Sequence, residues 1–167
     1  MKNYRFIILY VVFVIAQIVL CNFFGMSRYL LISVLPVLIL MLPLSWGSLP
    51  AMLMAFALGF VVDFFSNGML GMTSLALVPV ALVRRFVMGI VFGAEKSARG
   101  EEVTVERLGL PRAALASLML CSLYFILYVW IDSAGTYSFW AAFFRILLSI
   151  LVSTPVCVAV ARLLRPQ

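Results

Sequence analysis

Long uncharged stretches decide what this chain can fold into. Residues 6–24 contain no charged side chain, and comparable apolar runs follow through the rest of the chain. A helix needs roughly 20 apolar residues to cross the hydrocarbon core of a bilayer. Apolar residues make up 66% of the 167 residues and charged residues only 11%, which is too little polar surface for a water-soluble globule. The sequence therefore predicts an integral membrane protein.

Turn residues and charge clusters divide the chain into six apolar runs with short connections. We expect an all-α, polytopic fold that forms one transmembrane domain over residues 1–167. The second run contains Pro36 and Pro43, and the charged stretch 93–112 is expected to be a cytoplasmic loop. Residues 86–92 either continue the fourth span or lie along the membrane interface. The predicted spans are 6–24, 30–46, 49–65, 70–85, 113–131 and 139–164.

The positions of the basic residues predict the orientation, because short cytoplasmic loops accumulate lysine and arginine. With six spans and a cytoplasmic N-terminus, ten of the twelve basic residues lie on the cytoplasmic side. Arg28 falls in an outer loop and Arg145 within the last span. We therefore expect both termini in the cytoplasm. The ten cytoplasmic residues are Lys2, Arg5, Arg84, Arg85, Lys96, Arg99, Arg107, Arg112, Arg162 and Arg165.

Several classes of function are disfavoured by what the chain lacks. It contains no histidine, the commonest general base and metal ligand, so triad chemistry and metal chemistry are not expected. Its cysteines, Cys21, Cys121 and Cys157, are far apart in the sequence and have no CxxC spacing. The net charge of +6 is not arranged in a nucleic-acid-binding pattern. We expect no cofactor, no metal and no nucleic-acid partner.

Two charged residues fall inside predicted spans, where a charge is costly and calls for a reason. Asp63 lies near the outer end of the third span, and Arg145 lies about two turns into the last one. Gly59 precedes Asp63 by four positions, and Ser149 follows Arg145 by four, so each charge shares a face with a small residue. We hypothesise that Asp63 and Arg145 pair directly or share a polar cluster inside the bundle. The alternative is that each reaches to the outer headgroups.

Residues 50–71 carry a family resemblance. A span that ends in Gly59-x-x-x-Asp63 is followed by a short turn, by Leu70-Gly71 and by another apolar span, and Pro36 lies in the preceding span. In these features the chain resembles MreD, a small membrane protein of the bacterial rod-shape system. The specific motif covers about a quarter of the chain, whereas the size, the number of spans and the basic N-terminus agree throughout. The charged stretch 93–112 is longer than expected for this family.

The resemblance implies a role without enzymatic chemistry in the bacterial inner membrane. Such a protein binds MreC and helps to couple MreB filaments, directly or indirectly, to the peptidoglycan synthases that build the lateral wall. The resemblance also implies a fold similar to the substrate-binding component of energy-coupling-factor transporters. Pro36, Gly59, Asp63, Gly71 and Arg145 are then expected to be structural or partner-contact residues, and association into a homodimer stays open.

Two other functions remain as alternatives. A vitamin-binding transporter subunit would have the same number of helices, and it would dock on its membrane partner through small residues of the first helix. Ala16 is the one small aliphatic residue there, which disfavours this reading. A membrane enzyme would need paired catalytic residues, but Asp63 and Asp132 fall near the outer interface and no histidine assists them.

Overall fold

The structure is a computed structural model that describes residues 2–24, 31–42, 47–66, 69–92, 110–132 and 139–163. Within these residues the chain forms helices and no strand, which confirms the predicted all-α class. The helices are α1 (Lys2–Phe24), α2 (Leu35–Leu40), α3 (Ser48–Phe65), α4 (Met72–Phe92), α7 (Leu110–Asp132) and α8 (Phe139–Leu163).

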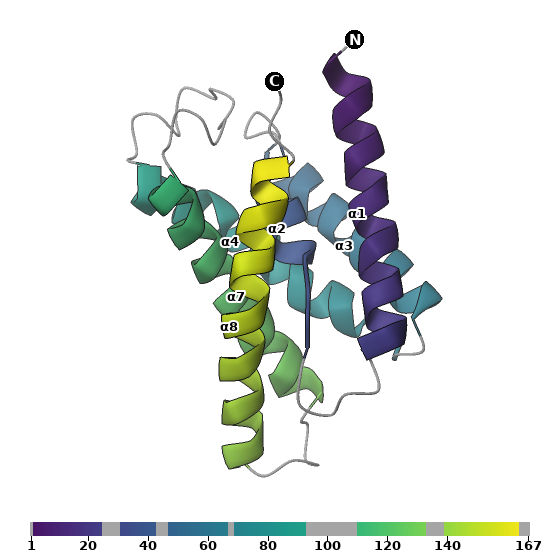
Figure 1. The fold of residues 1–167 in the computed structure, drawn as a ribbon, viewed down its shortest axis with the longest axis vertical. Helices are drawn as coiled ribbons and strands as arrows, with labels where there is room; N and C mark the ends of the chain where they lie inside the picture. Colours follow the sequence, from purple (N-terminus) through teal and green to yellow (C-terminus); the bar gives the residue numbers. More distant parts are fainter. Residues whose placement is uncertain are drawn as a thin grey trace.

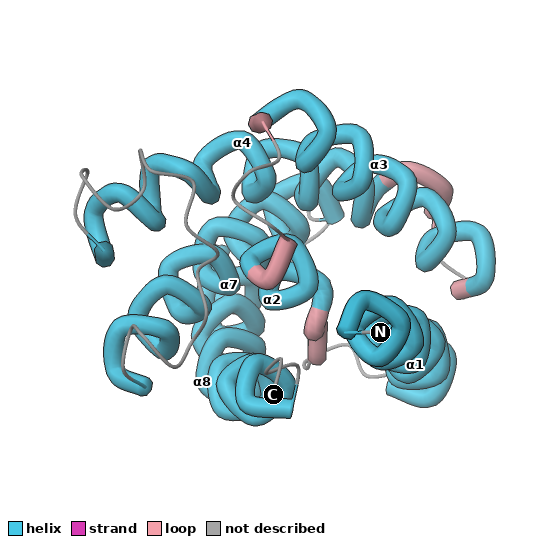
Figure 2. Tube along the Cα trace, turned by 90° about the horizontal axis from the view of Figure 1, so that it is seen from above, coloured by secondary structure: helices cyan, strands magenta, loops and turns pink. Residues whose placement is uncertain are grey.

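Five long helices surround a short one. Helix α1 packs on α3, α3 on α4, α4 on α7 and α7 on α8, and α2 contacts α1, α4, α7 and α8 from the middle. Figure 2 shows this arrangement from above, with α2 at the centre of an arc that α1 and α8 end. The start of α1 and the end of α8 lie at the same end of the bundle (Figure 1).

The central helix is the main departure from the predicted spans. The second span was predicted as a helix over 30–46 interrupted by prolines, but residues 31–34 are non-helical and α2 is six residues long. Pro36 occupies the first turn of α2, where a missing backbone N–H is tolerated, and proline disfavours a helical residue before it. The second proline of the predicted span, Pro43, lies outside the described residues.

The remaining helices follow the predicted spans, and the largest differences are at the end of α4 and the start of α7. Helix α4 continues to Phe92, so residues 86–92 extend the fourth span and do not form a separate interfacial piece. Helix α7 begins at Leu110, so the predicted loop 93–112 is wrong at residues 110–112. Pro111 fits at this helix start because the first backbone N–H groups of a helix need no intrahelical partner. The rest of the loop, residues 93–109, lies outside the described residues.

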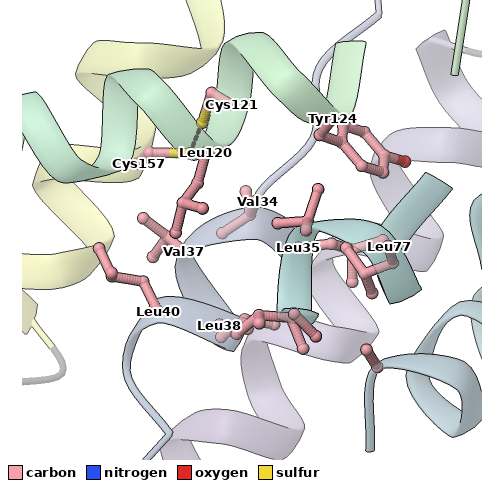
Figure 3. Packing of buried hydrophobic residues seen from close by; sticks show 14 of the residues in the cluster. Val34, Leu35, Val37, Leu38, Leu40, Leu77, Leu120, Cys121, Tyr124 and Cys157 are labelled. Carbon is pink, nitrogen blue, oxygen red and sulfur yellow. Dashed lines mark hydrogen bonds between the residues drawn. The ribbon is translucent and has the colours of Figure 1, made fainter. Parts of the chain in front are cut away.

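The buried core lies around α2. All six side chains of α2 are buried. They pack against Leu77 of α4 and against Leu120 and Tyr124 of α7, as Figure 3 shows. This packing makes a continuous apolar interior that links the central helix to the surrounding arc.

The outer faces of the long helices are apolar as well. Phe23 is 80% exposed, Leu53 63% and Leu151 72%. Four helices, α3, α4, α7 and α8, are long and apolar enough to cross a membrane, and the described part of α1 adds the apolar stretch Tyr10–Phe23. An exposed apolar surface on every long helix is what lipid requires and what water disfavours.

Candidate functional site

The predicted aspartate holds the turn between α3 and α4. Asp63 is buried, and its Oδ2 accepts hydrogen bonds from the backbone N–H groups of Gly71 at 2.9 Å and Thr73 at 3.0 Å. The carbonyl of Gly71 accepts the first helical bond of α4, from Leu75. Gly71 therefore sits at the N-cap position but has no side chain to act as a cap. Asp63 supplies the capping carboxylate from the neighbouring helix.

Two glycines make this turn possible. Gly71 has a φ of +95°, a backbone conformation that residues with a side chain rarely adopt. At Gly59 a Cβ atom would lie 2.6 Å from the backbone of Ser74, so a side chain there would collide with α4. The Ser74 hydroxyl also donates to the carbonyl of Phe56 at 3.2 Å. The motif residues Gly59, Asp63 and Gly71 thus form one unit, which we call the motif hairpin.

Arg145 lies in a different pair. Its Nη1 is 2.5 Å from Oδ2 of Asp132, at the point where α7 ends and α8 begins. The direct Asp63–Arg145 pair is therefore wrong, because backbone amides occupy the carboxylate of Asp63 and Asp132 lies closer to Arg145. The alternative, that Asp63 and Arg145 share a polar cluster inside the bundle, stays a hypothesis.

The non-helical segment 31–34 is a polar site that the sequence did not reveal. One edge of its backbone is held by α8. The N–H of Leu31 donates to the Ser149 hydroxyl at 3.1 Å, and the N–H of Ser33 donates to the Ser153 hydroxyl at 3.3 Å. In return, the Ser153 hydroxyl donates to the carbonyl of Leu31 and the Cys157 thiol to that of Ser33. The small side chains of α8, expected to provide close packing, bind backbone here.

A single side chain of α1 holds the other edge of this segment. The Oε1 atom of Gln17 accepts from the N–H of Val34 at 2.7 Å, and its Nε2 donates to the carbonyl of Ile32 at 3.2 Å. Nε2 also lies 3.2 Å from the sulfur of Cys21. Gln17 is 1% exposed, so its carboxamide is fully committed to these contacts. A lone carboxamide inside an apolar run was the sequence signal that could have identified it.

The backbone hydrogen bonds of this segment alternate between its two edges. Residues 31 and 33 bind side chains of α8, whereas the carbonyl of Ile32 and the N–H of Val34 bind Gln17 of α1. The carbonyl of Val34 accepts from the N–H groups of Val37 and Leu38 and so begins α2. Inside a bilayer, the N–H and carbonyl groups of any non-helical backbone need hydrogen-bond partners of this kind.

Arg84 is the second residue that the sequence did not single out. It was expected to lie at the cytoplasmic end of the fourth span, yet it is 2% exposed and lies eight residues before α4 ends. Its Nη2 donates to the carbonyl of Leu42, just beyond the C-terminal end of α2. A cation near a helix C-terminus is favourable. Its Nε atom is buried and has no hydrogen-bond partner among the described residues.

The cysteines lie close to the same segment. The sulfur atoms of Cys121 and Cys157 are 3.5 Å apart in the core, where both residues are fully buried free thiols (Figure 3). Within the described part of the chain, no group of three histidine, cysteine or acidic side chains is placed to hold a metal ion. The thiols act here as small core residues and weak hydrogen-bonding groups.

Comparison with protein-family models, with curated proteins and with solved structures gives no match. What bears on function is therefore the geometry itself. It consists of the motif hairpin, the segment held between α1 and α8, and the arginine at the end of α2. In all three, polar side chains bind backbone groups of the same chain.

Proposed function

We propose that this chain is a multi-pass protein of the bacterial inner membrane, with both termini in the cytoplasm, and a non-enzymatic scaffold of the cell-elongation machinery. In this role it binds MreC and helps to couple MreB filaments to lateral peptidoglycan synthesis. The observation that carries the proposal is the motif hairpin. Gly59, Asp63 and Gly71, the residues on which the resemblance to MreD rests, act together in a single structural unit.

The buried polar side chains bind backbone groups, and this supports the proposed scaffold role. Asp63, Gln17 and Ser153 are each engaged by backbone groups of this chain. A catalytic site instead keeps an acid, a base or a nucleophile directed at a substrate. Polar groups that hold backbone make a rigid body, which suits a protein that positions others.

The proposed topology of six membrane crossings is compatible with the short helix α2. An extended residue advances about 3.3 Å and a helical one about 1.5 Å, and Val34 already has helical backbone angles, so residues 31–42 can cover at most roughly 23 Å. This length approaches the roughly 30 Å of a hydrocarbon core. The second run therefore still counts as a crossing, and an even number of crossings places the start of α1 and the end of α8 on one side.

Affinity purification from native membranes tests the scaffold. A tagged chain is expected to bring down a membrane-anchored periplasmic protein with one span, the class to which MreC belongs. An Asp63→Ala variant should recover less of it, because the hairpin loses its cap, whereas a Ser122→Ala variant on the exposed side of α7 should recover as much as the wild type. Recovery of an ATPase pair in place of that protein contradicts the proposal.

A vitamin-binding subunit of an energy-coupling-factor transporter is the second candidate, and one observation favours it. Transporters often build their binding sites around discontinuous membrane helices, and the second run is discontinuous at residues 31–34. Native mass spectrometry of the purified chain separates the two candidates. A bound small molecule that is retained through purification favours the transporter subunit, and a chain free of ligand favours the scaffold.

Reporter fusions test the proposed topology independently of any partner. Fusions at residue 1 and at residue 167 should both be active with a cytoplasmic reporter and inactive with a periplasmic one. Opposite results at the two ends require an odd number of crossings, which contradicts the proposed arrangement.

A further inference from the structure

The arc of helices has one place where its ends meet through backbone and not through helix packing. Helices α1 and α8 end the arc, and the non-helical segment 31–34 lies between them (Figure 2). We call this place the seam, defined by residues 31–34 together with the sides of α1 and α8 that face them. Both edges of the seam are hydrogen bonds to backbone.

The two edges of the seam are unequal. On the α8 side, Ser149, Ser153 and Cys157 bind the segment along three successive turns, and α8 itself packs along α7. On the α1 side, Gln17 is the one side chain among the described residues that binds the segment, and it provides both the donor and the acceptor. The α1 edge is therefore the one that a change at a single residue can open.

The other described attachments of α1 are mainly apolar. Helix α1 packs on α3 and α2, and Asn22 donates to the carbonyl of Phe65 at 3.3 Å near the end of the helix. Ile8, Val12 and Ile15 on the opposite side are each more than half exposed. Outward movement of α1 therefore separates Phe13, Val14 and Ile18 from the core, whereas lipid covers the same outer side before and after the movement.

We propose that the seam is a lateral gate, in which α1 parts from the bundle at the Gln17 edge while residues 31–34 stay with α8. The proposal takes the membrane placement argued above as given, and it does not depend on the identity of any partner. Opening leaves the carbonyl of Ile32 and the N–H of Val34 without Gln17. Because bare backbone is costly in lipid, the gate is closed at rest. It opens when another group supplies both a donor and an acceptor.

Distance measurements between spin labels in lipid nanodiscs test the gate. Val12→Cys on α1 and Leu148→Cys on α8 place the labels on exposed positions. The background is Cys21→Ser, which removes the half-buried thiol and keeps an acceptor beside Gln17. Cys121 and Cys157 are fully buried and are not expected to react with the label. Gln17→Leu should add a population with longer distances between α1 and α8 that the parent protein lacks or barely shows.

Hydrogen exchange in the same nanodiscs shows which edge opens. In Gln17→Leu the amide of Val34 should exchange at least about tenfold faster, because it loses its acceptor. The amide of Ser33, held by Ser153 of α8, should change much less. Equal acceleration of both amides means that the segment loosens as a whole, which contradicts the gate.

Two further variants complete the test. Asn22→Ala removes a polar contact of the same helix at an exposed position, and it should leave the distances unchanged. If Gln17→Leu does not assemble, Gln17→Asn shortens the same carboxamide and is expected to give the same added population in smaller amount. Distance distributions that match the parent protein in whichever Gln17 variant assembles overturn the gate. A chain that does not enter nanodiscs contradicts the membrane placement instead.

Discussion

The motif hairpin and the seam solve the same physical problem with contacts of different range. In the motif hairpin, backbone N–H groups at the start of α4 bind Asp63, which precedes them by eight and ten residues. In the seam, backbone groups of residues 31 and 33 bind side chains of α8 that lie 118 to 124 residues further along the chain. Contacts between residues that are near in the chain can be recognised as a short sequence motif. Contacts between distant residues involve separate serines that form no motif. Substitutions in the two regions, taken from the largest expected effect to the smallest, test this contrast.

The largest effect is expected at the close approach of α3 and α4. In Gly59→Val the new Cβ collides with the backbone of Ser74, so the helices must separate, at a cost of about 3 kcal/mol in the free energy of unfolding. Gly89→Val in α4 is the matched control, because a Cβ there meets nothing within 4 Å. Unfolding by SDS in mixed micelles measures both. Equal stability of the two variants contradicts the described hairpin.

The second-largest effect is expected when the capping carboxylate of Asp63 is removed. Asp63→Ala leaves the N–H groups of Gly71 and Thr73 without their acceptor, and it should lower the free energy of unfolding by about 2 kcal/mol. Asp63→Asn keeps one oxygen acceptor and should cost about half as much. The same unfolding assay compares the two. If the asparagine variant is as unstable as the alanine variant, the negative charge matters more than the capping geometry.

The seam should respond less to a single change on its α8 side. Ser153→Ala removes an acceptor from Ser33 and a donor from Leu31, but Ser149 and Cys157 remain, so we expect a loss of about 1 kcal/mol. Ser122→Ala is the control, because Ser122 is partly exposed and its hydroxyl donates within its own helix, to the carbonyl of Met119. A loss larger than that of Asp63→Ala would reverse the order of the two regions.

The smallest effect is expected at the pair between α7 and α8. Asp132→Asn removes the charge that faces Arg145, but the Asp132 side chain is 29% exposed and water replaces part of the interaction. We expect a change of about 0.5 kcal/mol, which should decrease further in high salt. A loss comparable with that of Gly59→Val would show that this pair, and not the motif hairpin, holds the bundle together.

The same contrast explains what the sequence could predict. The all-α class follows from the uncharged runs, and the predicted ends of α1, α3 and α8 lie within a few residues of the observed ones. Gly59, Asp63 and Gly71 could be identified because their partners are near in the chain. Their shared role could be seen only when the structure placed the carboxylate against the amides of α4.

Other parts could not be predicted, for physical reasons. The length of α2 depends on Pro36 in its first turn and on side chains of α1 and α8 that stabilise a non-helical backbone. Arg84 was placed at a membrane surface because an arginine in a span usually reaches for headgroups. Its burial depends on the carbonyl of Leu42, whose position follows from where α2 ends. The choice of Asp132 over Asp63 as the partner of Arg145 depends likewise on the packing of α7 against α8.

The long reach of the seam has a consequence for biosynthesis. When the ribosome has made α1 and α2, Gln17 can already bind residues 32 and 34, but the hydroxyl groups for residues 31 and 33 do not yet exist. Until α8 emerges, these backbone groups need water or the insertion machinery as a temporary partner. The central segment is therefore expected to settle last, and a nascent chain that stops before α8 should remain bound to that machinery.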